Sequence, residues 1–343
     1  MCGPRRGQRC ESQGSTIVEW LACSTLALLI SAAPSSSATA NPVIWRDTGP
    51  VGTKDLYWGP GRPDQAPRPP FVFVKEDRSG TKPKVRVRDA NGMLWTAKFA
   101  SNSRTGTEVH AEIAVSRLMW AIGYFVEEHY FVANGTITGV SGLRRRTSHA
   151  IASDGTFSAA RFERRPPGIS NEGRWDLDDN PFAGSRELSG LKILVMLVNN
   201  WDARLDNTGI LRVPVRGGGI EERYILSDLG TAFGRMGNVA GRATRWNLTH
   251  YANSDFIRGV VGDTLVFCHG LHGSPPLSVS LEHARWLSAL ASQLTHAQVR
   301  RAFEASGAES REVDGFSSLV MSRIAQLRSA VDGTDAENGE ACS

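Results

Sequence analysis

Five polar residues in the middle of this sequence have the types that the transfer of a phosphoryl group requires. Lys98 and Glu112 come first, followed by Asp202, Asn207 and Asp228. A phosphoryl group in transfer carries negative charge on its oxygens, so a fixed cation and a bound metal ion must neutralise it. Carboxylate and amide oxygens suit Mg²⁺, and a carboxylate accepts the proton of an attacking hydroxyl. The five residues therefore indicate phosphoryl transfer, provided that the fold brings them together.

Four of these residues have expected roles in holding the donor. We expect Lys98 to bind the phosphates of ATP, with Glu112 fixing its ammonium group. Asn207 and Asp228 are the expected ligands of Mg²⁺ or Mn²⁺. Taken singly, each has an ordinary explanation as a surface lysine, a solvated helix residue, a helix cap or a turn. Only their order along the chain favours a common site.

Asp202 and four further positions complete the candidate site. Asp202 is the expected catalytic base, and Arg204 follows it by two positions, where it would act near the transferred phosphate. The turn Ser79-Gly80-Thr81 is the expected contact for the nucleotide phosphates. With one glycine instead of several, it is a weak phosphate cradle.

Hydrophobic periodicity predicts the elements that must position these residues. Strands are predicted at 71–75, 84–88 and 93–99, where the turn at 89–92 joins the second strand to the third. A helix is predicted at 107–122, and more strands follow up to residue 165. Lys98 therefore lies on a strand and Glu112 on a helix.

The second half of the sequence is mainly helical. Apolar residues at helical spacing predict a helix that ends just before Asn199. The remaining expected elements are a hairpin and three helices, at 209–215 with 222–226 and near 280–294, 296–306 and 313–330. This order predicts an α+β protein in two lobes. The expected boundaries are an irregular lead-in at 41–70, a β-rich lobe with one main helix at 71–165, a mostly helical lobe at 166–332 and a disordered tail at 333–343.

A strand lysine, a helix glutamate, a D-x-x-x-x-N loop and a D-x-G turn occur in this order in the protein-kinase-like superfamily, which this chain resembles. Within this superfamily it resembles an uncharacterised bacterial kinase-like family, itself distantly similar to HipA-type and phosphoinositide kinases. The resemblance covers residues 70–330 and is carried by the stretches 79–84, 108–123, 179–182, 198–202 and 228–230. Glu112 lies eleven residues before Gly123, as the pairing glutamate does in HipA-like chains.

The resemblance implies a two-lobed kinase-like fold that uses ATP and Mg²⁺ on a hydroxyl acceptor of unknown identity. Asn200-Trp201 replaces the His-Arg of ordinary protein kinases, and Leu229 replaces the Phe of D-F-G. These departures place the chain outside the eukaryotic-type kinases and remove no group that the chemistry needs. Two alternatives remain open: a pseudokinase, which is a nucleotide-binding or scaffold module without turnover, and an AMP transferase on the same fold.

The N-terminus has the pattern of a signal peptide. Arg5, Arg6 and Arg9 precede an apolar stretch at 21–33, and small residues lead to Ala40. The stretch is short for a membrane span. We therefore expect residues 1–40 to be removed, and the rest to be periplasmic or secreted, with no stable membrane insertion. The net charge of +4 over 343 residues is weak, so we expect no nucleic-acid partner.

Two other features bear on the exported chain. Cys268 and Cys342 remain after export, and an oxidising compartment permits a disulfide, but the position of Cys342 in a C-terminal tail argues against pairing. The densest basic patches are 144–146 and 161–165. They are expected to be a solvated face, or else a docking surface for an anionic substrate.

Overall fold

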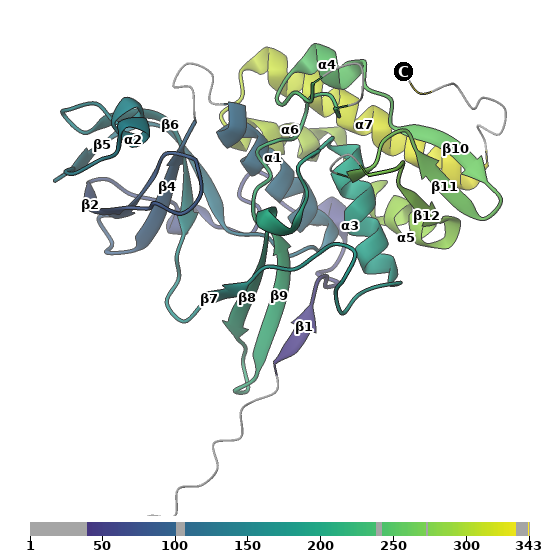
Figure 1. Ribbon diagram of the computed structural model, residues 1–343, viewed down its shortest axis with the longest axis horizontal. Coiled ribbons are helices and arrows are strands. Elements are labelled where there is room, and N and C mark those ends of the chain that lie inside the picture. The colour runs from purple at the N-terminus through teal and green to yellow at the C-terminus, as the bar shows by residue number, and fades with distance from the viewer. Residues whose placement is uncertain (1–39, 101–106, 238–241, 272–273, 334–341, 343) are drawn as a thin grey trace, which may run out of the picture. The chain divides into compact units, whose positions relative to one another are not determined.

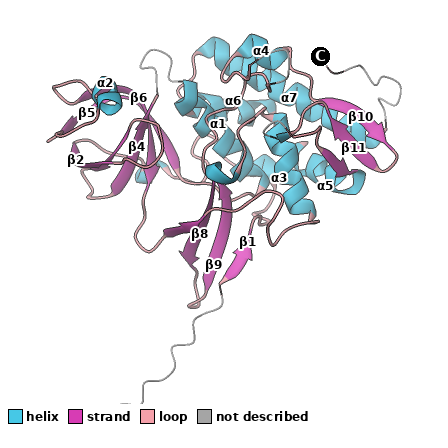
Figure 2. Ribbon diagram, in the orientation of Figure 1, coloured by secondary structure: helices cyan, strands magenta, loops and turns pink. Residues whose placement is uncertain are grey.

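The computed structural model describes residues 40–100, 107–237, 242–271, 274–333 and 342. They belong to one compact unit, Ala38–Ser343. The predicted signal peptide, apart from Ala40, lies outside the described residues. Helices and sheets are both present, and Figure 2 shows strands in three separate groups. The α+β class is therefore confirmed.

Five strands form a closed barrel in the order β2-β3-β4-β6-β5. They are β2 (Phe71–Glu76), β3 (Lys84–Arg88), β4 (Leu94–Phe99), β5 (His129–Thr138) and β6 (Thr156–Arg164). The alternation on β3 shows why this sequence makes a barrel wall. Val85 and Val87 are buried in the barrel core, whereas Lys84, Arg86 and Arg88 point to the other face.

Helix α1 (Thr107–Ile122) has the bounds that the sequence predicts. Figure 1 shows it between the barrel strands and the helices of the second half, and it contacts β5, β6 and α6. All but two of its residues are buried, which explains its weakly amphipathic sequence. A short helix, α2 (Arg145–Ala150), lies between β5 and β6, where the sequence indicates only strands.

A second sheet has the order β1-β9-β8-β7. Its strands are β1 (Asn41–Val43), β7 (Ser170–Gly173), β8 (Thr208–Pro214) and β9 (Ile220–Leu226). The hairpin β8–β9 was predicted, and β1 pairs in parallel with β9. The lead-in at 41–70 therefore contributes a strand, along with short 3₁₀ helices at Val51–Thr53 and Pro63–Gln65.

The larger hydrophobic core lies among the helices. These are α3 (Arg186–Leu197), α4 (Leu248–Ala252), α5 (Leu281–Ala291), α6 (His296–Ala305) and α7 (Ser310–Asp332). The side chain of Ser185 caps α3, and Thr295 with Gln298 forms the predicted capping box of α6. A third sheet of β10 (Ile257–Val261), β11 (Thr264–Phe267) and β12 (Ser278–Ser280) was not predicted. Among the described residues, no helix combines the length and the apolar character that crossing a membrane requires.

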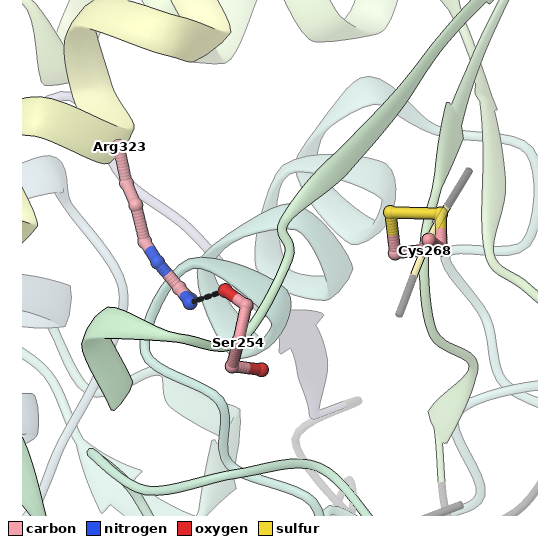
Figure 3. The surroundings of a disulfide bond; sticks show 4 residues. Ser254, Cys268 and Arg323 are labelled. Atoms are coloured by element: carbon pink, nitrogen blue, oxygen red, sulfur yellow. Dashed lines mark hydrogen bonds between the residues drawn. A yellow bond between two sulfur atoms is a disulfide. The ribbon is translucent and has the colours of Figure 1, made fainter. Parts of the chain in front are cut away.

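The expectation about the cysteines was wrong. Cys268 and Cys342 form a disulfide with a Cα–Cα distance of 5.4 Å (Figure 3). The tail thus returns to the end of β11 at Cys342, whereas residues 334–341 and 343 of the expected disordered tail lie outside the described residues.

Candidate functional site

The structure brings three of the predicted site residues together. Lys98 extends from β4, its ammonium group contacts Glu112 Oε1 on α1, and Asp228 Oδ1 lies 3.5 Å from Lys98 Nζ. Asp228 follows the end of β9. Glu112 is completely buried and Lys98 nearly so, whereas the side chain of Asp228 is 33% exposed. The cluster therefore has one open side, at the carboxylate of Asp228.

Arg161 is part of this cluster and was not identified from the sequence. It pairs with Lys98 in the register of β4 and β6, and its Nε lies 3.0 Å from Glu112 Oε2. Its Nη2 contacts Glu163 at 2.8 Å. Because Arg161 is buried and paired with two carboxylates, the basic patch at 161–165 is neither a solvated face nor an open docking surface at this residue. Strand alternation is the sequence signal that could have identified it, because alternation places Arg161 and Glu163 on one face of β6 and the buried Ala160 on the other.

The cluster shifts the protonation equilibria of its members. Burial lowers the pKa of Lys98, but the carboxylates of Glu112 and Asp228 outweigh this effect and leave it raised. Burial raises the pKa of Asp228, but Lys98 and further donors hold it well below its usual range. Burial raises the pKa of Glu112 to about 7, against the attraction of Arg161 and Lys98. Lys98 and Asp228 are therefore both charged at neutral pH.

A second group forms around Asp202. Asn207 Nδ2 donates to the carbonyl of Asp202 at 2.6 Å and to its Oδ2 at 3.0 Å. Arg204 is exposed, and its Nε lies 3.1 Å from Asp202 Oδ1. Asn207 ends a short 3₁₀ helix, Leu205–Asn207, which leads directly into β8. Asp202 thus has each carboxylate oxygen in contact with a side chain from its own loop.

Asn199 anchors the loop that carries Asp202. Asn199 has a φ of 51°, a left-handed conformation that asparagine adopts more readily than most residues. Its Nδ2 donates to the carbonyl of Gly234 at 2.8 Å, and its Oδ1 accepts from Arg323 of α7 at 2.7 Å. Figure 3 shows Arg323 reaching from its helix to the carbonyl of Ser254, to which it donates at 2.6 Å. Arg323 therefore positions the turn after α3.

Asn207 and Asp228 lie at the same end of the β8–β9 hairpin. Thr208 and Leu226 are partners in its register, and Ser227 N donates to the carbonyl of Asn207 at 2.9 Å. Asp228 is the next residue. The two groups described above are thus joined through the hairpin.

In the predicted phosphate-binding turn, polar groups of Ser79 and Thr81 already form hydrogen bonds within the chain. Ser79 donates from its backbone N–H at 3.0 Å and from its hydroxyl at 2.7 Å to Asp77 Oδ1. Gly80 has a φ of 70° and is exposed. The carbonyl of Thr81 accepts from Arg146 at 2.9 Å. The turn has the left-handed glycine that it needs, with the N–H of Ser79 directed to Asp77.

Glu108 links this turn to α1 and to the segment after Asp228. It is buried, and both Lys82 and Arg245 contact its Oε1. Glu108 and Glu112 lie one helical turn apart, so α1 holds a lysine with each. The contact with Arg245 depends on a loop whose path could not be predicted.

A groove of about 790 Å³ lies along the outer face of β3. Its lining is formed by Asp77, Ser79, Lys84, Arg86, Arg88, Asn91, Gly92, Met93, Leu94, Arg165, Pro166, Pro167, Gly168, Ile169 and Asn171. Lys84 is the register partner of Lys98 on β4, so the two lysines share a sheet face. The groove and the Lys98 cluster are therefore neighbours on this face.

One further cluster has metal-ligating side chains. Glu127, His129 and Glu163 place ligand atoms within 4.8 Å of one another. Arg161 Nη1 lies 2.8 Å from His129 Nε2, and Arg165 contacts both glutamates. Burial and Arg161 hold the pKa of His129 well below its usual range. The two arginines already neutralise the glutamates, so this cluster is an ion-pair network that holds Arg165 beside the groove.

No family model matches the sequence, and no curated protein matches it. Among solved structures, the chain is similar to the crystal structure of a Helicobacter pylori proinflammatory kinase, CtkA. The similarity covers 78% of this chain and 96% of that chain, with 11% identity and a TM-score of 0.43. A likeness of this size carries no argument about activity, which must be inferred from the geometry described above.

Proposed function

We propose that the protein is a kinase-like phosphotransferase with a two-lobed arrangement, which transfers a phosphoryl group from ATP to a hydroxyl acceptor. The observation that carries the proposal is the meeting of Lys98, Glu112 and Asp228 from a strand, a helix and a loop. A buried charge cluster with one open side is typical of functional sites. Its members are also the residue types that phosphate and metal binding need.

Each residue has a role that its surroundings support. Lys98 is charged and offers its ammonium group to the donor's phosphates. Glu112 holds that group in place from a fully buried position. Asp202 orients the acceptor hydroxyl and accepts its proton, and Arg204 holds the carboxylate of Asp202 in position.

The residues present fit a magnesium ion. Asp228 is ionised, because its pKa is well below its usual range, and part of its side chain is exposed. The amide nitrogen of Asn207 donates to Asp202. The amide oxygen, on the other arm of the same group, is the atom that would bind the ion. Both are hard oxygen ligands of the kind that Mg²⁺ takes together with water and phosphate. When bound, the ion would neutralise charge on the phosphate oxygens.

The proposal includes export to the periplasm or the medium. Its support is the signal-peptide pattern of residues 1–40 together with the disulfide between Cys268 and Cys342. Disulfides persist in oxidising compartments and are rare in the cytosol.

A second candidate is a pseudokinase that binds nucleotide without turnover. The observation that favours it is the turn at Ser79, whose N–H and hydroxyl both donate to Asp77. A turn engaged in this way offers fewer donors to position a phosphate for transfer.

The experiment that separates the two candidates is an acceptor screen by mass spectrometry. Wild type and Asp202→Ala are incubated with ATP, Mg²⁺ and a panel of protein, lipid, sugar and small-molecule acceptors, and products are read as phosphate or AMP mass shifts. We expect a phosphate shift for wild type and a rate about 10²–10⁴-fold lower for Asp202→Ala. Full activity of Asp202→Ala would contradict the assignment of the base. ATP binding without any product would favour the pseudokinase.

A further inference from the structure

The wall of the groove along β3 is strongly basic. Four lining residues are cations, and one, Asp77, is an anion; the cations are Lys84, Arg86, Arg88 and Arg165. Alternation on β3 puts three of the cations on one face at steps of about 6.6 Å, which is twice the rise per residue. The groove therefore presents a row of positive groups rather than a single one.

The positive charge of this row is only partly neutralised. Asp77 serves two cations, with Lys84 Nζ at 4.0 Å and Arg86 Nε at 3.4 Å. Arg88 donates to the carbonyl of Gly92 at 2.9 Å, a neutral acceptor. By contrast, Arg165 is held by two glutamates. The row on β3 therefore keeps an excess of positive charge that an anionic ligand would balance.

One stretch of the groove lining, residues 165–167, lacks the backbone donors that could recognise a nucleobase. Backbone N–H groups are among the polar groups that orient a ligand in a pocket. Arg165 N already donates to the carbonyl of Leu94 at 3.0 Å. Pro166 and Pro167 have no N–H at all. Three consecutive residues of the lining thus offer a base no free backbone donor.

We infer that the donor is recognised through its phosphate chain, by the row Lys84, Arg86 and Arg88, more than through its base. This inference rests on the proposed function, since it names how the donor of that reaction is held. The row lies on the sheet face of Lys98, and Lys84 is the register partner of Lys98, so a phosphate chain bound at the Lys84 end of the row would lie beside the Lys98 cluster. Guanidinium groups bind phosphate in a bidentate manner, which suits two arginines in this position.

Isothermal titration calorimetry with four probes tests the inference: ATP, GTP, inorganic tripolyphosphate and adenosine, each with Mg²⁺ at low and high salt. We expect ATP, GTP and tripolyphosphate to bind with similar affinity, and adenosine to give no signal. Arg86→Gln and Arg88→Gln should each weaken tripolyphosphate binding about tenfold, the scale of one lost charge-assisted hydrogen bond. Binding should also weaken at high salt.

Arg258→Gln is the matched control, because Arg258 is an exposed strand arginine on β10, in another sheet. It should bind tripolyphosphate as wild type does. Circular dichroism melting confirms that each variant is folded, and Arg88→Gln breaks only the contact with Gly92 among the interactions described for Arg88.

Two results would overturn the inference. One is adenosine binding with the affinity of ATP while tripolyphosphate does not bind. The other is tripolyphosphate binding to folded Arg86→Gln and Arg88→Gln at wild-type affinity. Failure of the proposed function has a different signature: phosphate-chain binding as expected, with no acceptor modified. In that case the groove assignment stands and the transfer reaction is contradicted.

Discussion

Arg161 Nε lies 3.0 Å from Glu112 Oε2, so this buried carboxylate has a cation from β6 beside it. Lys98 contacts the other oxygen of the same carboxylate. Glu112 would therefore keep one positive partner if Lys98 turned toward a phosphate in the proposed reaction. This arrangement would let the lysine act on a ligand while the buried carboxyl group keeps a cation beside it.

Loss of Arg161 should damage the fold more than loss of Lys98. Arg161→Met leaves Glu112 with one cation and removes a partner of Glu163, and breaking buried ion pairs typically costs about 3–5 kcal/mol. Lys98→Met leaves Arg161 to neutralise Glu112, and its other lost partner, Asp228, is partly exposed whereas Glu163 is buried, so this variant should cost less. Urea unfolding of both variants measures the difference. Equal unfolding free energies for Arg161→Met and wild type would show that the pairing is not stabilising.

Gly230 has little room for a larger side chain. A Cβ at this position would lie 3.2 Å from Glu112 Oε1 and 3.3 Å from Glu108 Cβ. Gly230→Ala should therefore lower stability by about 1–3 kcal/mol, because neither neighbour is free to move in a buried site. Gly173→Ala is the control, since a Cβ there meets nothing within 4 Å. If both variants unfold at the same urea concentration, the close packing of Gly230 against α1 is contradicted.

Asp228 should make stability depend on pH in the acid range. Its folded-state pKa is well below the unfolded value of about 3.9. The stabilisation by its carboxylate is thus fully present above about pH 4 and is lost as the pH falls toward the folded pKa. The difference in unfolding free energy between wild type and Asp228→Asn should shrink between pH 5 and about pH 3. A difference that stays constant over this range would mean that Asp228 is not held by Lys98.

The disulfide should stabilise the protein. Cys268 and Cys342 are 74 residues apart, and closing a loop of this size by a disulfide typically contributes about 2–4 kcal/mol. Cys342→Ser should lose that amount in urea unfolding under oxidising conditions. Intact mass measured after alkylation checks the bond directly. Alkylation of both Cys268 and Cys342 in the unreduced protein would contradict the pairing.

The strands and helices that carry the site followed from local patterns. The alternation of apolar residues on β3 and β4 and the apolar spacing over 107–122 were sufficient to predict these elements. The reason is that each segment buries one face or is entirely enclosed. The order of the site residues along the chain was the basis for expecting the ion pair of Lys98 with Glu112. Short strands such as β1 and β7 were missed, since three or four residues give too little periodicity.

What the sequence did not predict depends on contacts between distant segments. Arg161 looked like part of a basic surface patch, and only the pairing of β6 with β4 puts it beside Glu112. Glu108 contacts both Lys82 and Arg245, which are 163 positions apart in the sequence. The basic residues of β3 can be recognised from their alternation in the sequence, but the groove that they line also needs the distant segment 165–169. Partners of this kind are fixed by the tertiary fold.

Calorimetric titration of ATP with and without Mg²⁺ tests the central claim most directly. Wild type is compared with Asp228→Asn, and Asp206→Asn serves as the control, because Asp206 is an exposed acid beside Asn207. We predict that Mg²⁺ strengthens ATP binding to wild type and to Asp206→Asn, and that Asp228→Asn loses at least about tenfold of this gain. An affinity that is the same with and without Mg²⁺, and the same in all three proteins, would contradict a metal-assisted phosphotransfer site at Asp228.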